Sequence, residues 1–249
     1  MEVHAHAHTA RKKWTHYLWE FIMLFLAVFC GFLAENQREH MVEHRRAKAY
    51  AADLYSELKE DTTALSHLVI WNADLSKRFD TLCKLSTEDP SKVTTGMLYY
   101  YSGFTSWALY FESRNSTYEQ MKSSGNLRIM SHEISFGLSE YDRLLRSLSN
   151  DYALFKTEYE TISGLRMKIF DGLITETLFP KGLRIVNRDS AFRLNPPLVN
   201  SDPKLMKEFI GWVKSESRYI IGNTNDLLNP LKERADSLLL LLKKEYHLQ

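Results

Sequence analysis

Residues that break helices are scarce in this chain. Its 249 residues include 10 glycines and 6 prolines, and the first proline stands at position 90. Because proline and glycine are the residues least compatible with a helix interior, this scarcity favours an all-α fold built from long helices. From Glu35 to Leu85 nothing interrupts a helical pattern.

Cysteine and net charge are also nearly absent. Cys30 and Cys83 lie far apart, one inside an apolar run and one outside it, so we expect no disulfide scaffold. We interpret Cys83 as an isolated buried thiol, with an intermolecular bridge as the alternative. The chain has 32 Lys and Arg against 31 Asp and Glu. It therefore lacks the basic excess of a nucleic-acid-binding surface, and we expect no nucleic-acid partner.

Motifs that carry catalysis or hold cofactors are missing. The chain contains no glycine-rich phosphate loop, no GxSxG and no CxxC. His40 and His44 share a helical face, but HMVEH has its glutamate at the wrong place for a zinc HEXXH motif. The tail residues His4, His6 and His8 have no neighbouring carboxylate or thiolate to complete a metal site. We expect no enzyme, no cofactor and no metal ion.

The long apolar run is YLWEFIMLFLAVFCGFLA, residues 17–34, with Glu20 as its one charge. As a helix rising about 1.5 Å per residue it reaches roughly 27 Å, close to the thickness of a bilayer's hydrocarbon core. The apolar part of a cleaved signal peptide spans about 7–15 residues, so this longer run predicts a retained signal anchor. The basic cluster at 11–13 lies nearest the membrane. We therefore expect residues 1–16 in the cytoplasm and the main domain outside.

One helical face of this run carries a glutamate above mostly small residues, at steps of three and four: Glu20, Leu24, Ala27, Gly31 and Ala34. The opposite side carries Phe21, Phe25, Phe29 and Phe32. Small residues four apart let two membrane helices approach closely, so we predict that this face self-associates. In the alternative interpretation, Glu20 lies at headgroup depth, solvated or paired with a basic residue such as Lys13.

A membrane-proximal helix is predicted over residues 35–86. Positions at alternating steps of four and three from 47 to 82 read Ala, Ala, Leu, Leu, Asp, Leu, Leu, Asn, Leu, Phe, Leu. Such a heptad seam packs either inside one bundle or between chains. We favour the bundle for the distal half and self-association near Ala47 and Ala51. Asp61 and Asn72 interrupt the seam, where polar residues can set register or oligomeric state.

Residues 87–249 are predicted to complete an up-and-down helical bundle with 35–86. After a turn at 87–91 we expect a helix at 93–101, a helix capped by Asn115 or Ser116 with Glu119 and stopped by Gly125, and a long helix at 132–174. Residues 175–201 contain three prolines and predict a long loop, with a short strand pair near 183–186. Asp202 and Pro203 open the last helical stretch, with a kink expected at Pro230.

Aromatic residues gather between positions 99 and 111. They either close the end of a helical core or line a ligand pocket. The candidate pocket residues are Tyr100, Phe104, Trp107 and Tyr110.

Two stretches resemble an uncharacterised family of small bacterial single-span membrane proteins. The first is the glutamate-headed span with Ala27, Gly31 and Ala34 and its exit ENQRE at 35–39. The second is YEQMKSSGNL at 118–127, followed by a helix containing Tyr141. The resemblance implies a membrane-anchored, mostly helical extracytoplasmic protein, with no enzymatic activity or known ligand.

Taken together, these features predict a single-pass protein of the bacterial inner membrane with a periplasmic helical domain. We expect that domain to be a structural or protein-interaction module. The lipid bilayer and further copies of the chain are its expected partners. One alternative is a ligand-sensing bundle that uses the aromatic residues and the 175–201 loop. Another is an oligomeric assembly in which Glu20 lines an ion path.

Overall fold

The computed structural model describes residues 14–106, 109–178 and 188–248, and every regular element in these ranges is a helix. The predicted all-α fold is confirmed. The chain divides into two compact units, Met1–Tyr50 and Ala51–Gln249. The boundary falls inside α1 (Trp14–Leu85), a single helix of 72 residues. The described part of the first unit is the beginning of this helix, and the second unit is the bundle.

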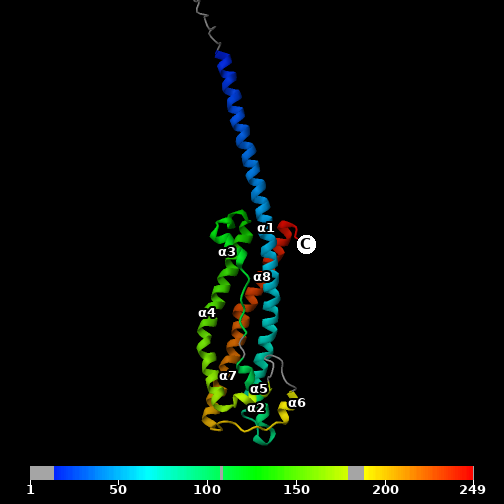
Figure 1. Ribbon diagram of the computed structural model, residues 1–249, viewed down its shortest axis with the longest axis vertical. Coiled ribbons are helices and arrows are strands. Elements are labelled where there is room, and N and C mark those ends of the chain that lie inside the picture. Colours follow the sequence, from blue (N-terminus) through cyan, green and yellow to red (C-terminus); the bar gives the residue numbers. More distant parts are fainter. Residues whose placement is uncertain (1–13, 107–108, 179–187, 249) are drawn as a thin grey trace, which may run out of the picture. The chain divides into compact units, whose positions relative to one another are not determined.

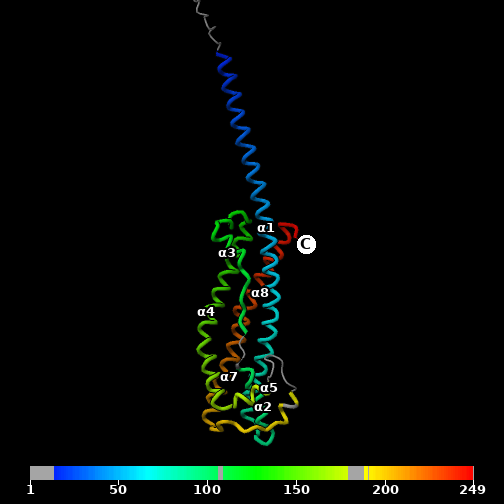
Figure 2. The backbone as a smooth tube through the Cα atoms, viewed as in Figure 1, coloured from blue at the N-terminus to red at the C-terminus, as the bar shows by residue number. Residues whose placement is uncertain are grey.

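Long helices form the body of the bundle. They are α1 from Ala51 onward, α4 (His132–Ile169), α7 (Pro203–Asn223) and α8 (Asn229–Tyr246), and they run side by side (Figures 1 and 2). Hydrogen bonds join α1 to the other end of the chain: Asn72 Nδ2 donates to Thr224 Oγ1 at 3.1 Å, and the Ser76 and Ser217 hydroxyls lie 3.0 Å apart. The up-and-down arrangement is therefore intramolecular.

The heptad seam of α1 is buried within the bundle. Its apolar members from position 51 on are at most 6% exposed: Ala51, Leu54, Leu58, Leu65, Leu68, Leu75, Phe79 and Leu82. Because Ala51 is completely covered by its own chain, it has no surface left for a second copy. The expectation of self-association at Ala51 is thus wrong, and the bundle interpretation of the seam holds here.

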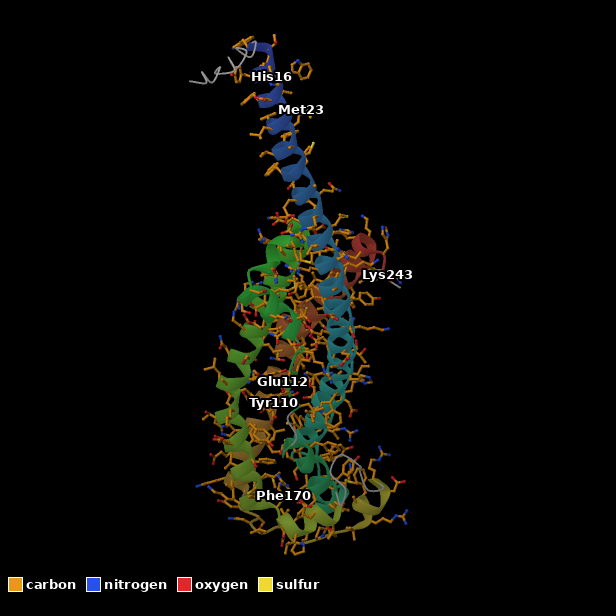
Figure 3. All side chains as sticks on the ribbon, turned by 45° about the horizontal axis from the view of Figure 1, so that its top comes forward. His16, Met23, Tyr110, Glu112, Phe170 and Lys243 are labelled. Carbon is orange, nitrogen blue, oxygen red and sulfur yellow. The ribbon has the colours of Figure 1, made fainter. Side chains whose placement is uncertain are left out.

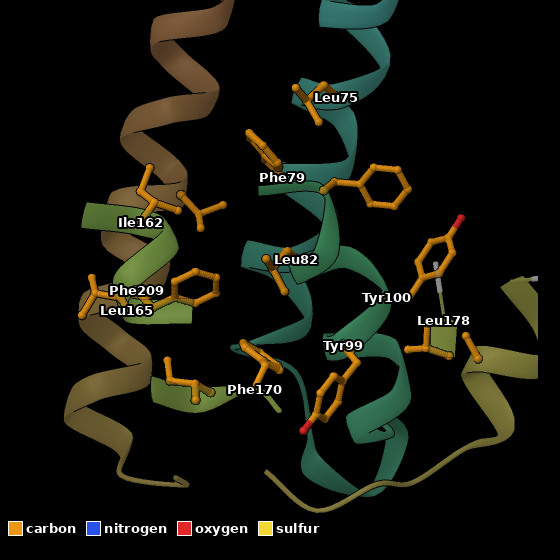
Figure 4. Packing of buried hydrophobic residues seen from close by; sticks show 14 of the residues in the cluster. Leu75, Phe79, Leu82, Tyr99, Tyr100, Ile162, Leu165, Phe170, Leu178 and Phe209 are labelled. Atoms are coloured by element: carbon orange, nitrogen blue, oxygen red, sulfur yellow. The ribbon is translucent and has the colours of Figure 1, made fainter. Parts of the chain in front are cut away.

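An apolar cluster lies at the end of the bundle where α1 stops. Figure 4 shows side chains of α1, α4 and α7 meeting there, among them Phe79, Ile162 and Phe209, each fully buried. Tyr99 adds its ring edge to Phe170, with centroids 5.0 Å apart. Its hydroxyl donates to the Pro197 carbonyl at 2.9 Å and accepts from the Asp171 N–H at 2.9 Å. This end of the core therefore has both apolar contacts and satisfied polar groups.

Short elements close this end of the bundle: η1 (Pro90–Lys92), α2 (Thr95–Gly103), η2 (Phe104–Ser106), α5 (Gly172–Leu178) and α6 (Arg188–Arg193). The predicted loop at 175–201 thus contains the end of α5 and all of α6, while the proposed strand pair at 183–186 lies outside the described residues. A Cβ on Gly96 would lie 2.1 Å from the Ala191 carbonyl oxygen. Glycine at position 96 is what lets α2 pack this closely on α6.

An extended run, residues 109–115, connects this end of the bundle to α3 (Ser116–Ser123) and η3 (Asn126–Ile129) at the other. The run lies antiparallel to α1: the Arg114 N–H donates to Asp61, and the Thr117 N–H donates to Glu57 one turn earlier in α1. The predicted capping box of α3 is wrong. Asn115 makes no side-chain capping bond, and the Glu57 carboxylate accepts hydrogen bonds at this helix start instead.

The remaining predicted boundaries hold in part. Asp202 caps α7 by accepting from the Lys204 N–H at 2.9 Å, and Gly125 adopts φ +71°, both as expected. The long helix predicted to reach 174 ends at Ile169, because Phe170 is extended. The irregularity expected at Pro230 takes the form of a π-helical turn, η4 (Thr224–Leu228), between α7 and α8.

Candidate functional site

The beginning of α1 carries a stretch that is long and apolar enough to cross a membrane, judged by length and composition. None of this stretch is buried. Bulky side chains such as Phe21, Leu24 and Phe32 are each more than 60% exposed. Exposed apolar surface of this extent is rare on proteins surrounded by water alone.

The residues of the predicted association face are exposed on α1. Glu20, Leu24, Ala27, Gly31 and Ala34 are all exposed, and a Cβ added to Gly31 would meet no atom within 4 Å. Glu20 has a local partner, because His16 Nε2 lies 3.2 Å from its Oε1 one turn earlier. Lys13, the partner considered from the sequence, lies outside the described residues.

The predicted aromatic pocket does not form as a unit. Tyr100 and Phe104 are 4% and 0% exposed and belong to the apolar cluster, with ring centroids 5.4 Å apart. They offer no surface to a ligand, so their role is to close the core. Trp107 lies outside the described residues. Tyr110 is separate from this pair: it is half exposed and its ring meets Tyr152 edge-on, with centroids 4.9 Å apart.

Tyr110 lines a small cavity that we call the Glu216 cavity. Its volume is about 30 Å³, and it lies between α1, α4, α7 and the extended run that carries Tyr110. Figure 3 labels Tyr110 on this run. Its polar lining residues are Asn72, Tyr110, Tyr152, Glu216, Tyr219 and Asn223, and apolar residues such as Leu75 and Phe155 complete the wall. Four separate segments of the chain thus converge on one buried acid.

Glu216 is 3% exposed, and its Oε2 is buried without a hydrogen-bond partner. Burial raises the pKa of its carboxyl to about 8, and the negative charge of Glu158 adds to the rise. Burial also raises the pKa of Tyr110, with a further contribution from the charge of Glu216. A carboxylate in this position is costly to ionise unless a positive charge or a donor reaches it.

The neighbouring polar groups already have partners of their own. The Tyr219 hydroxyl and Asn223 Nδ2 both donate to Asp151 Oδ2, and Asn72 Nδ2 donates to Thr224 on the π-helical turn. Tyr152 accepts from the Phe111 N–H at 3.3 Å, and burial raises the pKa of its hydroxyl to about 12. The Tyr219 hydroxyl and the Nδ2 groups of Asn72 and Asn223 therefore already donate elsewhere, whereas Glu216 Oε2 has no donor among the described residues.

A second buried acid, Asp61, has the opposite surroundings. It is 3% exposed and accepts from three donors: the Tyr141 hydroxyl at 2.7 Å, the Ser113 hydroxyl, and the Arg114 N–H at 3.1 Å. Burial, followed by the charge of Asp61, raises the pKa of Tyr141. This network fastens the extended run to α1 and α4, which makes Asp61 structural.

Sequence reasoning missed Glu216, although a signal was present. Phe209, Val213, Glu216 and Ile220 follow each other in α7 at steps of four, three and four, and all four are buried. Glu216 therefore occupies a core position on an amphipathic helix. No group of three or more His, Cys, Asp or Glu residues in the described ranges is arranged to hold a metal ion.

Comparisons with protein-family models, with curated proteins and with solved structures give no match to this chain. The resemblance drawn from residues 20–39 and 118–127 therefore stays a prediction.

Proposed function

We propose that this protein is a non-enzymatic, single-span membrane protein whose helical domain acts as a structural or protein-interaction module. One observation carries the proposal: the same helix, α1, is apolar and unburied at its beginning and supplies the buried seam of the bundle from Ala51 onward. A bilayer removes the first surface from water, while the second is already covered by its own chain.

The proposed location is the bacterial inner membrane, with residues 1–16 in the cytoplasm and the bundle in the periplasm. The basic residues Arg11, Lys12 and Lys13 immediately precede the helix and support this orientation under the positive-inside rule. Trp14, Tyr17 and Trp19 are exposed at the beginning of α1, where aromatic rings favour the interface between lipid and water.

We further propose that two or more copies associate through the face made by Glu20, Leu24, Ala27, Gly31 and Ala34. The open space around Gly31 supports this, because a second helix backbone can approach there without displacing a side chain. His16 gives Glu20 a partner on the same helix. This pairing is the alternative explanation for a glutamate in the apolar run, because it requires no second chain.

Membrane anchoring is tested by alkaline carbonate extraction of bacterial membranes that contain the full chain. We expect the protein in the membrane pellet with its N-terminus intact. The double substitution Phe25→Arg and Val28→Arg should release the protein from the membrane. Insertion of each Arg at the centre of a span costs roughly 2.5–3.5 kcal/mol. The matched control carries Phe25→Leu and Val28→Leu and should remain in the pellet. A soluble wild-type chain, or one cleaved after the apolar run, contradicts anchoring.

Association is tested by oxidative cross-linking in native membranes. The background replaces both natural thiols, Cys30→Ser and Cys83→Ser. Gly31→Cys on the proposed face should give disulfide-linked dimers, and Phe29→Cys on the opposite side should give few. Equal yields from the two positions, or monomers from both, would remove self-association from the proposal.

A further inference from the structure

We propose that the Glu216 cavity binds the head of a primary alkylammonium ion, a protonated amine, with Glu216 as the counter-ion. This goes beyond the proposed function, which assigns no ligand to the bundle. The proposal rests on the position of the acid, on the chemistry of the cavity wall, and on the size and opening of the cavity.

The first argument is the unpartnered oxygen. Glu216 is 3% exposed, and its Oε2 has no donor among the described residues. Buried polar atoms in native proteins nearly always have a partner, so an exception requires an explanation. At other buried or half-buried acids of the bundle the chain supplies that partner, as Tyr141 does for Asp61 and Tyr219 does for Asp151. At Glu216 the residues of the cavity wall donate no hydrogen bond to Oε2.

The second argument is that the wall attracts a cation. Asn72 and Asn223 both use their Nδ2 groups as donors elsewhere, so each keeps its Oδ1 as an acceptor. Aromatic rings also line the cavity: Tyr110 meets Tyr152 edge-on, and Phe155 and Tyr219 stack on each other with centroids 3.9 Å apart. A cation close to such rings is attracted by their negative faces. Acceptors and rings beside a carboxylate suit a positively charged donor.

The size of the cavity narrows the class of cation. Its volume of about 30 Å³ is two to three times the roughly 10–15 Å³ that one water needs, so an ammonium group with one or two carbons fits. The wall residues Leu109 and Tyr110 are 41% and 51% exposed, which leaves a way out for the tail of a longer amine. Tetramethylammonium is too bulky for this space. A divalent metal finds no third acidic, histidine or cysteine ligand among the described residues.

The π-helical turn η4 begins directly after Asn223, and its first residue, Thr224, accepts the hydrogen bond from Asn72. Single π-helical turns within helices are frequent at functional sites, because they change the direction in which side chains point. Here the turn adjoins two of the amide groups that line the cavity. The local departure from α-helix is therefore located where a ligand would be held.

Ligand binding should be coupled to proton release. The pKa of Glu216 is raised to about 8, so the carboxyl is mostly protonated at pH 6.5 and mostly ionised at pH 8.5. The charged or titratable groups around it are Glu158 on α4, whose charge adds to the rise, and the nearby Tyr110, Asp151, Tyr152, Tyr159 and Tyr219. The pKa values of these tyrosines are raised, so their hydroxyls stay neutral through this range.

The test is calorimetric titration of the full chain in lipid nanodiscs with ethylammonium chloride, at constant ionic strength. Ethylammonium stays charged throughout because amines of this kind titrate near pH 10. We expect binding that tightens about tenfold or more from pH 6.5 to 8.5 and releases protons. Tetramethylammonium should bind at least tenfold more weakly at pH 8.5. Equal affinity for the two ions, or no binding of either, would overturn the proposal.

Variants on the same helix separate the site from general charge effects. Glu216→Gln keeps the size of the side chain and should abolish both ethylammonium binding and its pH dependence. Glu208→Gln, at an exposed position of α7, should bind as the wild type does. Tyr110→Leu, at a half-exposed position that is not required for the core, should weaken binding several-fold. Unchanged binding by Glu216→Gln, with a circular dichroism spectrum like that of the wild type, contradicts the assignment.

Discussion

Asp61 and Glu216 are two buried acids with the same exposure, 3%, and opposite surroundings. Each stands on the inner face of a long helix, Asp61 in α1 and Glu216 in α7. Asp61 accepts hydrogen bonds from Tyr141, Ser113 and Arg114, whereas Glu216 has one oxygen with no donor in the described ranges. Burial is therefore the same for the two carboxylates. What differs is the number of hydrogen-bond donors around each, and this difference sets the role of the acid.

The difference separates a structural role from a binding role. Around Asp61, a fully donated carboxylate ties three segments together and stabilises the position of the extended run. At Glu216, burial raises the pKa of the carboxyl, and a cavity lies beside the side chain. Free energy of folding is lost at Glu216 whenever the carboxyl ionises, which is typical of residues retained for function rather than stability.

The largest effect is expected from Asp61→Ala. The substitution leaves the Tyr141 and Ser113 hydroxyls and the Arg114 N–H without their acceptor. Each buried donor left unpaired costs about 1–3 kcal/mol, so three together give the largest loss of stability expected here. Urea unfolding of the full chain at pH 7, followed by circular dichroism, measures the loss. The control Asp53→Ala lies at an exposed position of α1 and should change stability by less than about 0.5 kcal/mol. Equal effects of the two substitutions would refute the structural role of Asp61.

Glu216→Gln should raise the free energy of unfolding at high pH, whereas Asp61→Ala should lower it. The folded-state pKa of about 8 lies above the ordinary value of 4.5, so the folded chain holds a proton that the unfolded chain has lost. Stability from this group is complete below pH 4.5 and is lost as the pH rises through 8. Because each pKa unit corresponds to about 1.4 kcal/mol, the glutamine variant should be about 4–5 kcal/mol more stable than the wild type at pH 9, and nearly equal to it at pH 4.

Unfolding free energies at pH 4, 7 and 9 provide the measurement, with Glu208→Gln as the control. Glu208 is exposed on the same helix, so its replacement should leave the pH profile of stability unchanged. A glutamine variant at position 216 that is less stable than the wild type at pH 9 would mean that the carboxylate has a favourable partner, which contradicts the contrast with Asp61.

The burial of Asp61 could be predicted from the sequence more readily than the burial of Glu216. The heptad spacing of α1 placed Asp61 among leucines, so its burial followed from periodicity. Its partners did not, because Ser113 and Arg114 stand on an extended run whose path depends on tertiary contacts. Glu216 lies among Lys214, Ser215, Ser217 and Arg218, which read as a solvated surface. Only the spacing from Phe209 and Val213 identifies its core position.

The helices themselves were largely predictable, because local spacing and caps determine them. The seam of α1, the cap at Asp202 and the left-handed Gly125 needed no tertiary information. The start of α3 is a counterexample, since its capping carboxylate is Glu57, 59 residues before Ser116. The prediction of an aromatic pocket was wrong for a related reason. Tyr100 and Tyr110 are close in sequence, but Tyr100 lies in α2, whereas Tyr110 follows the end of that helix and lines the Glu216 cavity.

A smaller effect is expected when a single hydroxyl is removed next to each site. Tyr141→Phe deletes one charge-assisted hydrogen bond to Asp61 and should cost about 2 kcal/mol. Tyr110→Phe beside Glu216 deletes a hydroxyl with no hydrogen bond in the described part of the chain, and should cost less than about 0.5 kcal/mol. Urea denaturation midpoints compare the two. Similar losses would mean that both acids rely on their neighbouring tyrosines.

A smaller loss than that of Tyr141→Phe is expected at Glu57, which accepts hydrogen bonds at the start of α3. Glu57→Gln keeps an acceptor but removes the negative charge near the N-terminus of the helix, so a loss of about 1 kcal/mol is expected. Amide hydrogen exchange at Thr117 and Tyr118 measures local opening of α3. Exchange that is unchanged there, or accelerated equally throughout the bundle, would show that Glu57 does not cap this helix.

The titration of Glu216 tests the contrast between the two acids most directly. The pH dependence of the ¹³C shift of its side-chain carboxyl can be followed in the full chain, with Glu216→Gln used to assign the signal. A buried carboxyl without a partner should titrate with a midpoint near pH 8, and added ethylammonium should move the midpoint downward. A midpoint near 4.5, unmoved by the amine, would show that solvent or a donor already satisfies Glu216 and would contradict the account.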